Sequence, residues 1–200
     1  MALDDQEFAS PLLQLPNTYR AFYGSFQHLQ PLQTEAIAPI LAGRDLVLQS
    51  ATGSGKTEAV LAPCIEGVIR SKGAESILYI VPTRALAIDL ERRFVSILTQ
   101  RLGLPFGIRT GDVKRNGGRP CLMLTTPESF DVLMGSSNRD LQGFLRRVRR
   151  VVIDEVHPLV NQYRGKQLAC LLRRLQRRTG EPIQKIALSA TISDVKGIMD

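Results

Sequence analysis

Two groups of residues in this chain could bind and cleave a phosphoanhydride. The first is ATGSGKTEA, which begins at Ala51 and directly follows the apolar run DLVLQ. Glycines at this spacing let backbone N–H groups close around the β- and γ-phosphates of a nucleotide, although the general pattern has glycine where Ala51 stands. Lys56 adds a positive charge, and the Thr57 hydroxyl can bind Mg²⁺. We predict a phosphate-binding loop whose residues contact the nucleotide: Thr52, Gly53, Ser54, Gly55, Lys56 and Thr57.

The second group is the acidic pair in RVVIDEVH, which an apolar strand would deliver at its carboxyl end. Asp154 can hold Mg²⁺ through water, and Glu155 can polarise the water that attacks the γ-phosphate. An acidic pair after a strand is weak evidence alone but strong evidence beside a phosphate loop. We therefore predict Lys56, Asp154 and Glu155 as catalytic residues, with Thr57 and Asp154 as metal ligands.

Short β-rich runs alternate with helical stretches, which is how a parallel sheet would position these residues. Nearly continuous apolar strands separated by crossover helices indicate a sheet covered on both faces, with ligands at the carboxyl ends of the strands. We expect an α/β doubly wound domain, in which the polar stretch 111–120 is an exposed loop. The predicted strands are 45–49, 76–81, 107–110, 121–125, 150–154 and 185–189, and the predicted helices are 56–71, 84–101, 127–134 and 162–178.

Composition fits a globular domain of 200 residues, with 44% apolar and 22% charged residues. No apolar run approaches the ~20 residues that span a bilayer, and MALDDQEFAS does not resemble a signal peptide, so we expect a cytoplasmic protein. The odd number of cysteines favours no disulfide framework, and we expect small buried side chains at Cys64, Cys121 and Cys170.

The net charge of +7 comes from one segment, because ten Arg or Lys residues face two acids between Arg146 and Arg178. We expect a buried leucine stripe on the last helix, with arginines on its solvated opposite face. A surface that contacts phosphates is the alternative interpretation. The stripe is Leu168, Leu171, Leu172 and Leu175, and the two basic clusters are Arg146, Arg147, Arg149 and Arg150, then Arg173, Arg174, Arg177 and Arg178.

Further motifs complete a pattern that resembles the superfamily 2 helicases from about residue 22 to residue 193. ATGSGKT matches the first motif of that family, DEVH the second in its DExH form, and the SAT of LSATIS the third. PTRALAIDL (82–90) and TTPES (125–129) are similar to the family's nucleic-acid motifs. RTGD (109–112) and the Arg164-Gly165 pair are most similar to the large-helicase-related (Lhr-like) branch.

The resemblance implies a RecA-like fold, ATP and Mg²⁺ as cofactors, and a site role for each matching residue. Contacts to a sugar-phosphate backbone carry no base identity, so sequence-independent binding of one strand is expected. His157, Ser189 and Thr191 would couple nucleotide state to the grip on nucleic acid. The residues along the strand would be Thr83, Arg84, Gly111, Thr126, Pro127 and Glu128.

Upstream, FQHLQPLQ is similar to the family's adenine-reading segment, with Gln33 placed to offer a donor and an acceptor to adenine. The match is partial, because Leu29 and Gln30 stand where the DEAD branch has Pro and Thr. We expect Phe22, Tyr23 and Phe26 to pack onto the domain rather than stack on a base. The resulting division is an N-terminal extension over 1–30 and an ATP-binding domain over 31–200.

Three functions remain open at this point. The first is a nucleic-acid-dependent ATPase that moves along one strand and unwinds duplexes. The second is a translocase of a restriction or defence system that does not separate strands, and the third is a non-hydrolysing ATP or nucleic-acid binding module. For the first two, the family implies a second RecA-like domain in a longer polypeptide, which supplies an arginine finger worth on the order of 10³ to 10⁵ in turnover.

Overall fold

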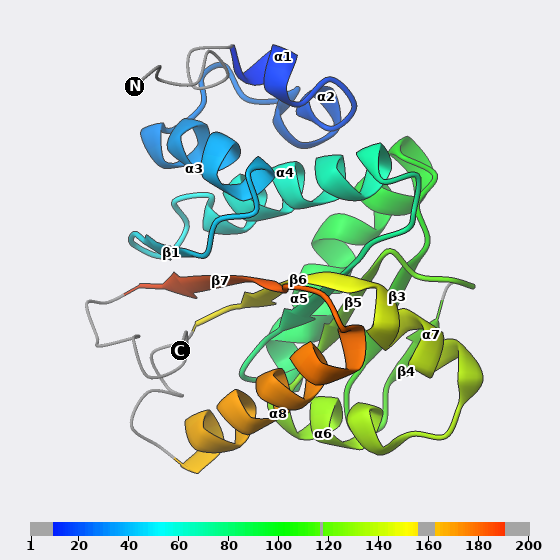
Figure 1. The fold of residues 1–200 in the computed structure, drawn as a ribbon. Helices are drawn as coiled ribbons and strands as arrows, with labels where there is room; N and C mark the ends of the chain where they lie inside the picture. Colours follow the sequence, from blue (N-terminus) through cyan, green and yellow to red (C-terminus); the bar gives the residue numbers. More distant parts are fainter. Residues whose placement is uncertain (1–9, 117, 156–162, 191–200) are drawn as a thin grey trace, which may run out of the picture.

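The structure is a computed structural model that describes residues 10–116, 118–155 and 163–190. Its centre is a seven-stranded sheet in the order β1-β7-β6-β2-β5-β3-β4 (Figure 1). Every neighbouring pair is parallel except β3 and β4, which are antiparallel. The strands are β1 (Leu46–Gln49), β2 (Ser76–Ile80), β3 (Phe106–Arg109), β4 (Lys114–Asn116), β5 (Leu122–Thr125), β6 (Val148–Ile153) and β7 (Gln184–Ser189).

Helices cover both faces of this sheet, as the doubly wound fold requires (Figure 1). The described helices are α1 (Pro11–Gln14), α2 (Tyr19–Tyr23), α3 (Pro31–Leu41), α4 (Lys56–Arg70), α5 (Arg84–Val95), the π-helical segment η2 (Ser96–Arg101), α6 (Pro127–Gly135), α7 (Arg139–Arg147) and α8 (Tyr163–Thr179). One apolar core lies between one face of the sheet and the helices α2, α3, α4, α5 and η2. A second core lies between the other face of the sheet and the helices α6, α7 and α8.

Alternation along β2 shows why both faces are apolar. Ile77 and Tyr79 belong to the first core, whereas Leu78 and Ile80 belong to the second, and all four are fully buried. A central parallel strand must be apolar on both faces because helices cover both sides of the sheet. The fold class predicted from the sequence is confirmed, as are the six predicted strands and four predicted helices, with small shifts at their ends.

One local prediction was wrong, because the stretch predicted as a loop over 111–120 contains strand β4. Thr110 N donates to the Val113 carbonyl oxygen at 2.9 Å, which closes a tight turn after β3. The chain then returns antiparallel to β3, with Arg109 opposite Lys114. A polar edge strand carries no apolar pattern, since its outer side faces solvent, and charged residues there discourage pairing with another chain.

The segment before β1 was expected to be an extension, and its described part shares the first core. Glu66 on α4 is fully buried and accepts hydrogen bonds from the backbone N–H groups of Asn17 and Thr18, both at 3.1 Å. Phe22 and Tyr23 are buried in the same core, as predicted. These contacts fix the position from which the chain enters α3.

The arginine-rich helix α8 buries its leucine stripe as predicted, with arginines on the opposite side. Arg150, from the first basic cluster, does not lie on the surface, because it is buried and paired with Glu75.

Burial raises the pKa of the Cys64 and Cys121 thiols to about 12, as expected for structural cysteines. Cys170 is exposed, so the prediction of burial was wrong for that residue, which lies off the leucine stripe. Within the described ranges, no helix has the length and apolarity to cross a membrane.

Candidate functional site

The six parallel strands bring all the described motifs to one edge of the sheet, the edge formed by their carboxyl ends. The phosphate loop follows β1, the acidic pair follows β6, and Ser189 ends β7. The motifs PTRALAIDL, TTPES and RTGD lie at the carboxyl ends of β2, β5 and β3, in that order. Since β1, β7 and β6 are consecutive in the sheet, whereas β5 and β3 lie beyond β2, the strand order separates a nucleotide half from a second half of the same edge.

The phosphate loop has the backbone that its glycines predict. Gly53 and Gly55 both have φ of +78°, a left-handed conformation that side chains with Cβ rarely adopt. At Gly55 a Cβ would also lie 2.5 Å from Nε2 of Gln33. The left-handed conformation therefore favours glycine at Gly55, and a side chain there would also displace the Gln33 amide.

Lys56 begins helix α4 and is 7% exposed. Its ammonium group donates to the backbone carbonyl oxygens of Ser50 and of Ala51, the second at 2.7 Å. The loop thus folds over its own lysine, which holds a positive charge beside the free N–H groups at the start of the helix. Both features favour a bound anion.

Asp154 lies across from the loop and is buried at the end of β6. Its Oδ2 accepts a hydrogen bond from the Tyr79 hydroxyl at 2.8 Å, and its Oδ1 accepts one from the Glu155 N–H at 2.9 Å. Burial raises the pKa of Asp154, and the bond from Tyr79 opposes that rise. Burial and the Asp154 carboxylate raise the pKa of the Tyr79 hydroxyl, and Thr57 opposes that rise.

Tyr79 was not predicted as a site residue, because it stands inside an apolar strand with no polar neighbour in sequence. Replacing it by Phe is expected to raise the pKa of Asp154 further and to weaken Mg²⁺ binding about 10–100-fold. Since Mg²⁺ needs the ionised carboxylate, affinity falls as pH falls through that pKa, and the loss would begin at higher pH in the variant. Mg²⁺ titrations of nucleotide binding between pH 5 and pH 8 measure this. Tyr163→Phe, at an exposed tyrosine, is the control; identical Mg²⁺ curves for both variants would contradict the prediction.

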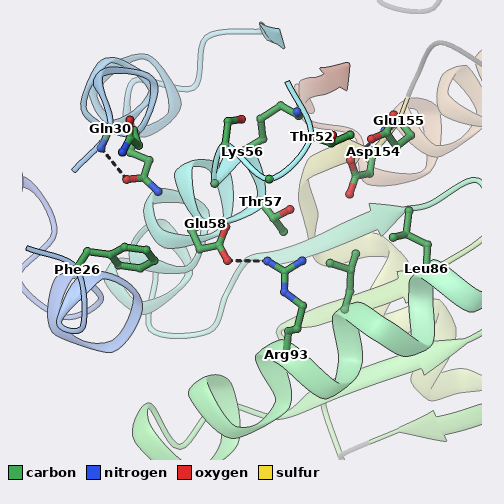
Figure 2. A pocket seen from close by; sticks show the side chains of 15 residues that line it. Phe26, Gln30, Thr52, Lys56, Thr57, Glu58, Leu86, Arg93, Asp154 and Glu155 are labelled. Atoms are coloured by element: carbon green, nitrogen blue, oxygen red, sulfur yellow. Dashed lines mark hydrogen bonds and ion pairs between the residues drawn. The ribbon is translucent and has the colours of Figure 1, made fainter. Parts of the chain in front are cut away.

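Glu155 adopts a left-handed backbone conformation, with φ of +48°. Among the described residues, Lys72 is the other non-glycine residue with positive φ. Such a conformation costs of order 1–3 kcal/mol and occurs often at functional sites. It turns the chain sharply where β6 ends, and the Glu155 side chain lines the same cleft as Asp154 and Lys56 (Figure 2).

These groups surround one cleft of about 600 Å³ (Figure 2). Phe26 packs edge-to-face on Tyr23, with ring centroids 6.4 Å apart, but it is 49% exposed and lines the cleft. Gln33 also lines the cleft but is buried, and its Oε1 accepts a hydrogen bond from Gln30 N at 3.0 Å. Arg93 on α5, which was not predicted, reaches the cleft and pairs with Glu58 at 2.7 Å.

At the second half of the edge, two threonines cap helices. The Thr83 hydroxyl accepts from Leu86 N at 3.3 Å at the start of α5, and the Thr126 hydroxyl accepts from Ser129 N at 3.4 Å at the start of α6. Each motif therefore presents a helix amino end, where free N–H groups favour anions. Gly111, after β3, is exposed, with nothing within 4 Å of where its Cβ would stand.

Ion pairs connect these motifs to each other. Arg84, after β2, pairs with Asp112, after β3, at 2.5 Å, although β5 lies between the two strands. Arg164 of α8 pairs with Glu128 at 2.6 Å and also donates to the Pro82 carbonyl oxygen at 3.2 Å. Burial alone would raise the pKa of Glu128, but its bonds to backbone N–H and to Arg164 lower it.

The remaining predicted residues fall into two groups. Pro127, in the first turn of α6, and Ser189 are buried, and the Ser189 carbonyl oxygen accepts from Ser50 N at 3.2 Å, which joins β7 to the start of the phosphate loop. His157 and Thr191 lie outside the described residues. The structure thus brings the nucleotide residues into one cleft and the other described motif residues to the neighbouring stretch of the same edge.

A phosphate loop after β1 and an acidic pair after β6, on a RecA-like sheet, define the class of P-loop nucleoside triphosphatase domains. The chain belongs to the DEAD/DEAH box helicase family, whose model matches residues 30–198. Within this family it is a helicase ATP-binding domain, and its relatives include Lhr-type helicases.

The comparisons support this assignment. The chain is 35% identical over 193 residues to the Lhr helicase and probable uracil glycosylase of Mycolicibacterium smegmatis, covering 86% of this chain and 12% of that protein. It is 32% identical to the ATP-dependent helicase Lhr-Core of Sulfolobus acidocaldarius, over 92% of this chain and 23% of that protein. The chain therefore spans less than a quarter of the length of these two relatives.

Solved structures agree with the fold. The structure of Mycobacterium smegmatis helicase Lhr bound to ssDNA and AMP-PNP superposes with a TM-score of 0.78 at 30% identity, over 95% of this chain and 26% of that one. The DEAD-box helicase Mss116 bound to ssRNA and UDP-BeF gives a TM-score of 0.80 at 24% identity, over 92% of this chain and 41% of that one. The second likeness concerns the fold alone.

Proposed function

We propose that this chain is the ATP-binding half of a nucleic-acid-dependent ATPase that moves along one strand and separates duplexes. The observation that carries the proposal is the shared edge: one cleft holds Lys56, Asp154 and Glu155, and the neighbouring strand ends hold three further motifs. A change at the nucleotide can pass to the other half because α5 is capped by Thr83 and reaches the cleft through Arg93.

In the proposed reaction each residue has one task. The loop amides and Lys56 bind the ATP phosphates, and Glu155 accepts a proton from the attacking water. Thr57 and Asp154 would hold Mg²⁺, which when bound neutralises charge on the phosphates. This donor set fits Mg²⁺, which uses one or two carboxylates together with substrate phosphates. Among the described residues, no group of three or more His, Cys, Asp or Glu side chains could bind a metal ion by itself.

The strand would bind through the motifs that follow β2, β3 and β5. Helix amino ends at Thr83 and Thr126 offer N–H groups to phosphates, and Arg84 offers a guanidinium. The Glu128 carboxylate is paired with Arg164, so we assign it a supporting task instead of direct phosphate contact. Such contacts read no bases, which predicts sequence-independent binding.

A second RecA-like domain of the same polypeptide completes the proposed motor. It would close on the cleft and supply an arginine finger, which is worth on the order of 10³ to 10⁵ in turnover. Differences in grip between the two domains through the ATP cycle would then produce stepping. The length of the relatives, several times that of this chain, supports this proposal.

The test is steady-state ATP hydrolysis by the full-length protein, alone and then with single-stranded DNA or single-stranded RNA. We expect stimulation by at least one polymer, and both are needed because one similar structure holds ssDNA and another ssRNA. Bound nucleotide without turnover would favour the binding-module alternative. Stimulated turnover with movement along continuous duplex but no unwinding of a tailed duplex would favour the translocase alternative.

Gln33→Ala is expected to weaken ATP binding about tenfold and to reduce selection of ATP over GTP. The reason is that Gln33 lines the cleft beside Gly55, so its amide can support the loop and offer a donor toward the base. Binding of the two nucleotides, measured by titration calorimetry, checks this. Gln142→Ala, on α7 outside the cleft, is the control; an unchanged ATP to GTP ratio at Gln33 would contradict base reading.

A further inference from the structure

A second concave site lies outside the nucleotide cleft and the three edge motifs. It has a volume of about 450 Å³ and is formed by one face of α7 and the loop that precedes β5. Arg139, Gly143 and Arg147 follow each other at four-residue spacing on α7, so they share one helix face. Arg119 comes from the loop and lines the same site. We call these four residues the arginine cleft.

The arginine cleft lies at the opposite end of the strands from the nucleotide. Arg147 donates to the backbone carbonyl oxygens of Gly73, before β2, and Pro120, before β5, at 3.3 and 3.2 Å. Arg147 itself directly precedes β6. Figure 1 shows α7 beside the β3 and β4 side of the sheet, away from β1. A ligand in this cleft would therefore not be the ATP bound at Lys56.

Three positive charges meet there without carboxylate partners. Within the described ranges, none of Arg119, Arg139 and Arg147 forms an ion pair, whereas several other arginines do. Among the described residues that line the cleft, Asp140 is the one acid, and it makes no ion pair there. Arg119 and Arg147 line the same cleft, and burial together with the charge of Arg119 lowers the pKa of Arg147. Like charges held near each other repel, which raises the free energy of the protein without a ligand, and a bound anion relieves that repulsion.

Gly143 shapes the cleft. It lies in the interior of α7, where glycine destabilises a helix relative to alanine. A Cβ at this position would meet nothing within 4 Å, and the backbone is not left-handed, so neither packing nor conformation requires glycine. A side chain there would instead project into the space between Arg139 and Arg147. The glycine keeps that space open.

We propose that the arginine cleft binds a backbone phosphate of nucleic acid, at a contact separate from the strand-end motifs. Guanidinium groups suit phosphate because their planar N–H forks match its oxygens. This inference rests on the proposed function, which brings nucleic acid to the domain. The bound polymer would then be held by the motifs at the carboxyl ends of the strands and again at α7.

The main test compares two double variants for binding of single-stranded and duplex DNA and RNA across a salt series. Arg119→Ala with Arg139→Ala removes two cleft charges and leaves Arg147, which supports two loops. We expect the slope of log affinity against log salt to become shallower by about 0.7–0.9 for each lost phosphate contact. Arg20→Ala with Arg44→Ala, at two exposed positions outside both basic clusters, removes the same net charge and is the control. Equal slopes in both double variants would overturn the proposal.

Gly143 variants separate binding from folding. Gly143→Ala is expected to raise Tm by about 2–4 °C, because alanine stabilises the helix. Gly143→Glu is expected to keep the cooperative unfolding transition and to flatten the salt slope as the cleft double variant does, since it places a carboxylate between the arginines. A Gly143→Glu protein that folds and binds nucleic acid with the original slope would contradict the proposal.

Two further outcomes identify the source of the phosphate. If pyrophosphate raises Tm without nucleotide and the cleft double variant abolishes that rise, but nucleic-acid affinity is unchanged, the cleft binds free phosphates and the nucleic-acid proposal is overturned. If the unmodified protein binds no nucleic acid at all, the proposal fails together with the proposed function. If the unmodified protein binds nucleic acid but its ATP hydrolysis is not stimulated, the motor function is removed. A shallower salt slope in the cleft double variant would still support the cleft proposal in that case.

Discussion

Glu155→Gln is expected to lower the ATP turnover of the full-length protein by about 10²–10⁴-fold while nucleotide still binds. That range is the usual contribution of a general base. Glutamine has nearly the same shape, so the hydrogen bond from this residue's N–H to Asp154 Oδ1 persists, and the phosphate loop is untouched. The amide cannot accept a proton from water at neutral pH, and only the chemical step is lost.

The measurement is turnover at saturating nucleic acid together with the Kd for ATP by calorimetry. Glu35→Gln, at an exposed position on α3, provides the matched control and should leave both values unchanged. Turnover in Glu155→Gln within about twofold of the original protein would remove Glu155 as the base. Loss of binding instead of turnover would indicate that the left-handed turn at Glu155, and not its carboxylate, was the feature that mattered.

Chemistry that is local in sequence could be predicted, because each motif is a short run whose backbone and side chains act together. The phosphate loop needs Gly53, Gly55 and Lys56 within four residues, and the parallel sheet then brings the acidic pair opposite. The same logic predicted the two-sided burial of the strands. In both cases the pattern in the sequence is the physical cause of the structure.

Contacts between elements distant in sequence could not be predicted. Tyr79 reaches Asp154 only because β2 pairs with β6, and nothing in SILYIV marks its hydroxyl as different from a core aromatic. Arg84 meets Asp112 across an intervening strand. Both pairings depend on strand order, which local propensity does not specify.

Helix α7 was not predicted for a related reason. Its buried residues are Leu141, Phe144 and Leu145, a short stripe interrupted by charges. Gly143 in its interior also lowers the helix propensity of the segment. A helix stabilised mainly by packing onto a core leaves a weak pattern in sequence, because tertiary contacts supply what propensity does not.

Lys56→Ala is expected to raise the Kd for ATP by about 10–100-fold, and so to lose binding as well as hydrolysis. A hydrogen bond to a charged group contributes roughly 1.5–3 kcal/mol, which corresponds to that range. The structure adds a second reason. The ammonium group bonds to the carbonyl oxygens of Ser50 and Ala51, so its removal also frees the loop that must close around the phosphates.

Lys56→Arg separates these two contributions. Arginine keeps the positive charge and can still donate to loop carbonyls, but its planar fork does not fit the space of a compact ammonium group. We expect intermediate ATP affinity, measured by the same calorimetry, with Lys166→Ala on the exposed face of α8 as the control. If Lys56→Ala bound ATP as tightly as the original protein, the positive charge would contribute nothing to the nucleotide. Because Glu155→Gln should lose turnover alone and Lys56→Ala should lose binding too, the two variants together test whether this cleft divides binding and catalysis between its two sides.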